Sequence, residues 1–74
     1  MKVKEGNVYY NPKGKYKFVI VGRTLKQSID ACKWYAIRST FRSISVIWQS
    51  QIDNCIYLGR SKGIDDLFQV EEEL

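Results

Sequence analysis

The clearest structural signal in the chain is the stretch VYYNPKGKYKFVI, residues 8–20. Its centre, NPKG at 11–14, has the residue types of a type I turn, with Asn first, Pro second and Gly fourth. After the turn, Tyr16, Phe18 and Ile20 alternate with residues that begin as lysines and continue as valines, which is typical of a strand with one buried face. The stretch therefore predicts a β-hairpin whose second strand runs over 15–23.

The segment that follows the hairpin is predicted to be a helix from Leu25 to Thr40. TLKQ at 24–27 has the spacing of a capping box, with a hydroxyl three residues before an amide. Two apolar stripes have helical spacing: Leu25, Ile29, Cys32 and Ala36 form one, and Trp34, Ile37 and Phe41 form the other on nearly the opposite side. The alternative is that part of this segment is a strand, because aromatic and β-branched residues such as those at 34–37 favour strands.

A second hairpin is predicted over 44–60. Apolar and polar residues alternate from Ile44 to Ile52, Asp53-Asn54 is suited to a two-residue turn, and CIYLGR at 55–60 returns. A tight turn at this point predicts that Ile52 opposes Cys55, Ser50 opposes Tyr57 and Trp48 opposes Gly59. Beyond it, we expect a helical turn over 64–68 and a short edge strand over 69–71.

These elements predict an α+β fold, a small antiparallel sheet of two hairpins with one central helix, in the order β-β-α-β-β plus a short C-terminal helical turn. The alternative is an SH3-like small barrel with an inserted helix. The 74 residues allow one domain, which we assign to 1–70, followed by an acidic tail at 71–74.

Charge is unevenly distributed along the chain. The formal net charge is +4, with 12 Lys and Arg against 8 Asp and Glu, but five of the acids fall within 65–74. A basic body of this kind attracts polyanions. The longest apolar run, FVIV at 18–21, is far too short to cross a bilayer, and the first residues have no signal-peptide pattern. We therefore expect a cytoplasmic protein that does not contact a membrane.

The residue types for catalysis are scarce. The chain has no His, no Gly-rich phosphate loop and no nucleophile motif. Its two cysteines, Cys32 and Cys55, cannot complete a zinc site alone, and a disulfide is disfavoured in the cytosol, so we expect both to be small buried side chains. The sequence therefore predicts a protein that is not an enzyme, with no metal, no cofactor and no small-molecule substrate.

The first functional hypothesis is a binding module, because one small interior cannot bury apolar residues on both sides of the helix and of the second hairpin. Exposed apolar patches mark interaction sites, and Trp and Arg are enriched in them. The expected partner-binding residues are Trp34, Ile37, Phe41 and Arg38. The partner would be another protein or a second copy. In size and composition the chain resembles the small accessory proteins that phages encode to bind host machinery.

The second hypothesis is nucleic-acid binding, because lysines and tyrosines are interleaved around the first turn. Sheet-based binders combine phosphate contacts with stacking rings in this way. The expected contact residues are Lys13, Lys15, Lys17, Tyr16, Arg38 and Arg42. No RNP or GXXG motif accompanies them, and lysines on an exposed strand also serve to prevent aggregation. The salt dependence of binding separates the two hypotheses.

Overall fold

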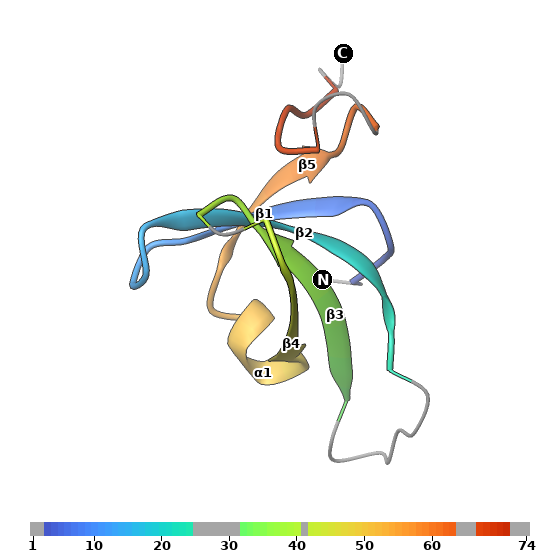
Figure 1. The fold of residues 1–74 in the computed structure, drawn as a ribbon. Coiled ribbons are helices and arrows are strands. Elements are labelled where there is room, and N and C mark those ends of the chain that lie inside the picture. Colours follow the sequence, from blue (N-terminus) through green and yellow to red (C-terminus); the bar gives the residue numbers. More distant parts are fainter. Residues whose placement is uncertain (1–2, 25–31, 41, 64–66, 72–74) are drawn as a thin grey trace.

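The computed structural model describes residues 3–24, 32–40, 42–63 and 67–71. The elements are β1 (Asn7–Asn11), β2 (Tyr16–Arg23), β3 (Lys33–Arg38), β4 (Ile44–Trp48), α1 (Gln49–Ile52) and β5 (Ile56–Arg60). The strands form one antiparallel sheet in the order β4-β3-β2-β1-β5. Figure 1 shows that this sheet is strongly curved, with β2 bending as it passes from β1 towards β3. The described part of the chain is therefore dominated by its sheet and has one short helix.

The first hairpin is confirmed. β1 and β2 pair with Tyr9 opposite Phe18 and Asn11 opposite Tyr16. Asn11 makes the turn itself, since its Oδ1 accepts the backbone N–H groups of Lys13 at 3.0 Å and of Gly14 at 3.2 Å. The turn closes with Lys15 in the left-handed region at φ 57°.

The predicted helix is wrong for its second half. Residues 33–38 form strand β3, which pairs with β2 on one side and with β4 on the other; residues 25–31 lie outside the described residues. Trp34 of one predicted stripe and Ala36 of the other are buried on the same face of β3, while Tyr35 is exposed, so the residues follow the two-residue period of a strand and the helical stripes do not form. The alternative strand interpretation is confirmed for this segment, because pairing on both edges outweighs local helix preference.

The second hairpin is also wrong. β4 and β5 lie at opposite edges of the sheet, so the predicted pairs Ser50–Tyr57 and Trp48–Gly59 do not form, and Ile52 and Cys55 are joined only by a turn bond. The strand that begins at Ile44 ends at Trp48, and residues 49–52 form the helical turn α1 instead of continuing the strand. Backbone N–H groups of Asp53 and Cys55 bond back into this turn, at 3.0 Å to Gln49 and 2.9 Å to Ile52. β5 can therefore leave β4 and pair with β1.

The core lies on one face of the curved sheet, which we call the inner face. It holds Val3, Tyr9, Phe18, Ile20, Trp34, Ala36, Ile47 and Ile52. Because Ile52 belongs to this cluster, α1 packs against the inner face and closes one side of the core (Figure 1). The opposite, outer face is buried at Val8 and Val19, which are paired at the middle of the sheet.

The C-terminal segment returns to the sheet beside β5. Val70 forms an isolated bridge with Ser61, and the backbone N–H of Glu71 donates to Arg60 at 2.9 Å. A Cβ at Gly59, whose φ is +137°, would lie 3.2 Å from the Val70 Cβ, so the valine packs directly on the glycine. The short edge pairing expected near 69–71 is thus present at one residue. Of the helical turn expected over 64–68, residues 64–66 lie outside the described residues, while 67 and 68 form a turn.

None of the described helices has the length and apolar character that crossing a membrane requires.

Tyr9 is a core residue with a titratable hydroxyl, which makes the stability of the fold sensitive to alkaline pH. Asn7 Nδ2 donates to the Tyr9 hydroxyl at 3.2 Å. Burial raises the pKa of Tyr9 above its ordinary value of 10.0, because the buried phenolate would lose its hydration, while the Asn7 bond acts in the opposite direction. The folded protein therefore keeps this proton after the unfolded chain has released it.

We expect the free energy of unfolding to fall as the pH rises above about 10, by up to about 1.4 kcal/mol per pH unit from this group. The stabilisation is fully present below the pKa of the unfolded tyrosine and is lost as the pH rises through the raised pKa of the folded one. Urea denaturation between pH 8 and 11 measures the slope. The free energy of unfolding of Tyr9→Phe should fall less steeply with pH than that of the wild type. Identical slopes for the two proteins would contradict a raised pKa for Tyr9 in the folded state.

Candidate binding surfaces

The outer face of the β3–β4 hairpin carries an exposed apolar surface. We call it the hairpin patch, and its residues are the exposed Tyr35, Ile44, Val46 and Trp48 and the half-buried Ile37. The register places Tyr35 opposite Val46 and Ile37 opposite Ile44, so the side chains form cross-strand pairs on one face. Their neighbours in the chain, Trp34, Ala36 and Ile47, point to the core. Strand alternation thus divides the hairpin into a buried face and an exposed apolar face.

The degree of exposure distinguishes this patch from scattered surface residues. Ile44 is 67% exposed, Val46 50% and Trp48 42%. At the end of the patch, the Lys33 ammonium lies 4.4 Å from the centre of the Trp48 ring, a cation–π contact. A contiguous apolar surface of this kind on a small protein is typical of an interaction site.

The patch lies at an unprotected edge of the sheet. β4 is the last strand in the order, so within the described residues its outer edge faces no strand. Natural edge strands are usually protected by charges, proline or bulges. β4, with the sequence ISVIW, has no charge and no proline, and its pairing with β3 has no register shift. As far as the described residues show, the β4 backbone is therefore available for pairing.

The opposite edge strand, β5, is protected. Its pairing with β1 shifts register next to Leu58, and it ends in the charged Arg60. The Ser61–Val70 bridge follows immediately. Although Ile56 is exposed on this strand, β5 has the bulge and charge that β4 lacks.

The structure separates the four residues expected to bind a partner. Trp34 is only 7% exposed, and its Nε1 donates to Gln49 Oε1 at 2.8 Å, which ties the core to α1. Ile37 lies in the hairpin patch and Arg38 lies on the inner side against Tyr16. Phe41 lies outside the described residues. The candidate surface therefore moves from Trp34 to Trp48, on the other face of the same hairpin.

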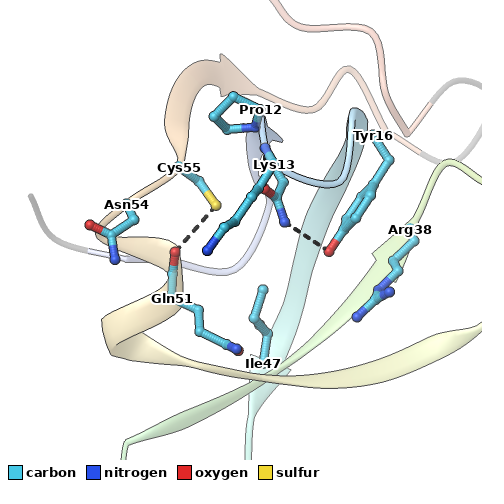
Figure 2. A pocket seen from close by; sticks show the side chains of 9 residues that line it. Pro12, Lys13, Tyr16, Arg38, Ile47, Gln51, Asn54 and Cys55 are labelled. Carbon is cyan, nitrogen blue, oxygen red and sulfur yellow. Dashed lines mark hydrogen bonds between the residues drawn. The ribbon is translucent and has the colours of Figure 1, made fainter.

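A second candidate surface is a hollow of about 590 Å³ between the β1–β2 turn, β3, β4 and α1. It is lined by Asn11, Pro12, Lys13, Tyr16, Arg38, Ile47, Gln51, Asn54 and Cys55. Figure 2 shows the ends of Lys13 and Arg38 on either side of Ile47. No carboxylate is among the described residues that line the hollow, so its two cations make it electropositive.

Contacts within the wall hold the Arg38 side of the hollow in place. The Arg38 guanidinium carbon lies 4.8 Å from the centre of the Tyr16 ring. Tyr16 is in turn fixed by Asn11, whose Nδ2 donates to the phenol oxygen at 3.1 Å, and by its contact with Phe18 at 6.2 Å between ring centres. The guanidinium is therefore positioned by an aromatic ring that is itself anchored to the core.

The hollow brings together three of the six residues expected to bind nucleic acid, namely Lys13, Tyr16 and Arg38. The other three lie elsewhere. Lys17 pairs with Tyr10 on the outer face, Arg42 lies 5.7 Å from the ring centre of Phe68, and Lys15 does not line the hollow. The sequence showed no sign of Gln51 and Asn54, because only tertiary folding brings α1 beside the first turn.

The two cysteines are free and half-buried. The Cys55 thiol, at the edge of the hollow, donates to the backbone oxygen of Gln51 at 3.3 Å. Burial raises the pKa of Cys55 above its ordinary value of 9.0, so at neutral pH it is a protonated thiol of low reactivity. Cys32 accepts a bond from Arg23 at 3.7 Å. Among the described residues, no three His, Cys, Asp or Glu side chains gather in a metal-binding group.

Comparisons of the chain with protein families, with curated proteins and with solved structures find no match. Proposals about its function therefore depend on the two surfaces described above.

Proposed function

We propose that this protein is a non-enzymatic binding module that acts by pairing the edge strand β4 with a protein partner, and that the partner is a second copy of the chain. The observation that carries the proposal is the hairpin patch at an edge with no protecting charge, proline or bulge. Addition of a strand to such an edge supplies main-chain hydrogen bonds, and apolar side chains beside it supply buried area.

The symmetry of β4 favours a second copy. Val46 is the central residue of the five. Antiparallel pairing of two β4 strands about a two-fold axis at Val46 places Ile44 of one copy opposite Trp48 of the other, on the same face. The two hairpin patches then lie side by side on one face of a continuous sheet. No like charges meet across the pairing, because β4 carries no charge. Closed two-fold assembly also uses up the open edge, so no further copies add.

A finer description of the fold belongs to the same proposal. We infer that the chain is a small open barrel of the SH3-like kind, the alternative that the sequence left open. Supporting it are the order β4-β3-β2-β1-β5, the helical turn between β4 and β5, and the register shift of β2 against β3 around Val21, where the sheet bends. Folds of this kind host many activities, so the fold by itself assigns no function.

The experiment compares two edge substitutions of matched exposure. Val46 on β4 is 50% exposed and Ile56 on β5 is 53% exposed. Val46→Lys places a charge at the proposed two-fold axis, once from each copy, and should weaken dimerisation at least about tenfold, or 1.4 kcal/mol. Ile56→Lys should leave dimerisation unchanged. Sedimentation equilibrium at 5–500 μM protein, at low and at high salt, measures the dimer dissociation constants of the two variants and of the wild type.

Two results would refute this proposal. One is a wild-type protein that remains monomeric through the whole concentration range. The other is an equal loss of association in both variants, which would place the interface away from β4. Thermal unfolding of each variant, diluted to where the wild type is monomeric, checks that the lysine has not damaged the fold.

A further inference from the structure

The hollow lies on the opposite side of β3 from the hairpin patch, so it can act independently of association through β4. Its volume of about 590 Å³ is within the range of sites that enclose a small organic ligand. Its described lining has two cations, three side-chain amides, one phenol, one thiol and two apolar side chains, Pro12 and Ile47. A mixture of this kind suits a ligand that has both an anionic group and a flat polar ring.

Lys13 and Arg38 are the residues that would bind the anionic group of the ligand. Lys13 belongs to the β1–β2 turn and Arg38 to the end of β3, and they reach the hollow from different elements (Figure 2). An ammonium supplies a mobile point charge, while a guanidinium supplies a rigid fork that matches two phosphate oxygens. Because Tyr16 already orients Arg38, less conformational entropy is lost when the fork binds.

The polar ring would be bound by Gln51, which lies beside the apolar Ile47, and by Asn54, which lies farther out (Figure 2). Gln51 Oε1 accepts from the Trp48 backbone at 3.3 Å, and none of the described bonds uses its Nε2 donor. Asn54 Nδ2 donates to the Ser50 oxygen at 3.2 Å, and none of the described bonds uses its Oδ1 acceptor. Gln51 thus leaves one donor beside Ile47 and Asn54 leaves one acceptor at the rim of the hollow, and an unpaired base has both a donor and an acceptor on its edge.

We infer that the hollow binds one nucleotide unit, with its phosphate between Lys13 and Arg38 and its base over Ile47, within reach of the amides of Gln51 and Asn54. The unit can come from a free nucleoside monophosphate or from a single strand of nucleic acid, since both present the same phosphate and base. This site goes beyond the proposed association through β4 and does not depend on it.

The test uses AMP, a ten-nucleotide single strand of poly(A), adenosine and inorganic phosphate as probes at 20 mM salt. Calorimetry gives the dissociation constants, and ¹H–¹⁵N spectra locate the shifts. Lys13→Gln and Arg38→Gln should each weaken binding of AMP or the oligonucleotide at least about tenfold. Lys17→Gln removes the same charge from the outer face and should change the dissociation constant less than about twofold. A lysine away from the hollow acts on the ligand only through long-range electrostatics, which salt screens.

Cys55 provides a second measurement within the wild-type chain. Bound nucleotide should slow its alkylation by iodoacetamide several-fold and leave the rate at Cys32 unchanged, as followed by mass spectrometry of the two peptides. Thermal unfolding of Arg38→Gln separates loss of binding from loss of fold, and Lys13, exposed in the turn, is free of that concern.

The arms of the experiment distinguish the two sources. Tighter binding of AMP than of the strand, per nucleotide, identifies a free nucleotide as the ligand. Tighter binding of the strand, falling with salt, identifies single-stranded nucleic acid. The inference is overturned if neither binds, if inorganic phosphate binds as tightly as AMP, or if Lys17→Gln loses as much affinity as Lys13→Gln.

Discussion

Replacing Trp34 by alanine should lower the free energy of unfolding by about 3–5 kcal/mol. The indole is 7% exposed and lies in the cluster on the inner face, opposite Ile47 in the β3–β4 register. Its removal leaves a cavity that a small sheet cannot refill, and it leaves the Gln49 oxygen without the Nε1 donor at 2.8 Å. Urea denaturation followed by circular dichroism measures the loss.

The matched control for this prediction is the other tryptophan. Trp48→Ala removes an indole of the same size from the outer face of the same hairpin, where it is 42% exposed. We expect a loss of less than about 1 kcal/mol, because much of the ring is already in water. Both substitutions are made in a Val46→Lys background, so that association does not contribute. Similar losses for the two tryptophans would show that the faces of the hairpin are assigned incorrectly.

Phe18→Ala should leave the domain at or beyond the limit of folding. Phe18 is fully buried in β2, and its ring stacks on Tyr9 at 5.5 Å and contacts Tyr16 at 6.2 Å between ring centres. The cavity alone is worth about 3–5 kcal/mol, and each aromatic pair adds about 0.5–1.5 kcal/mol. A domain of this length has only about 4–11 kcal/mol in total. The amide proton spectrum of the variant should therefore lose its dispersion at 25 °C.

Two neighbouring changes separate the loss of volume from the loss of aromatic character. Phe18→Leu retains most of the volume and should fold, with a loss near 1.5 kcal/mol. Lys17→Ala, the adjacent exposed position, should stay within about 0.5 kcal/mol of the wild type. A Phe18→Ala protein that melts within a few degrees of the wild type would contradict the assignment of the core.

The mistakes of the sequence interpretation have a common physical cause. The apolar residues of 33–38 fit helical spacing as well as the two-residue period of a strand, and pairing with both β2 and β4 is what makes the segment a strand. Asp53-Asn54 suited a tight turn, yet a hairpin there would have left the edge of β1 without β5. Both errors came from local preference, which is weaker than the hydrogen bonds of a complete sheet.

The candidate surfaces show the same division. The alternation of Ile44, Val46 and Trp48 identified side chains that share one face, but only the packing of Ile47 against Trp34 decided that this face is the exposed one. The interleaving of lysines and tyrosines around the first turn predicted a role for Lys13 and Tyr16, and Arg38 was predicted to extend that basic surface. Their meeting at one hollow with Gln51 and Asn54 depends on where α1 packs.

What the sequence determined by itself was local: the Asn11 turn, the hairpin around it, the start of a strand at Ile44 but not its end, and the shortage of catalytic residue types. These follow from contacts between residues a few positions apart, whose geometry residue type and spacing already specify. The tertiary structure alone decided which strands are neighbours, which face of the β3–β4 hairpin is buried and which side chains surround the hollow. Those outcomes depend on the entropy lost when long loops close and on the free energy gained when a shared apolar core is buried. Neither quantity can be assessed from a short stretch of the chain.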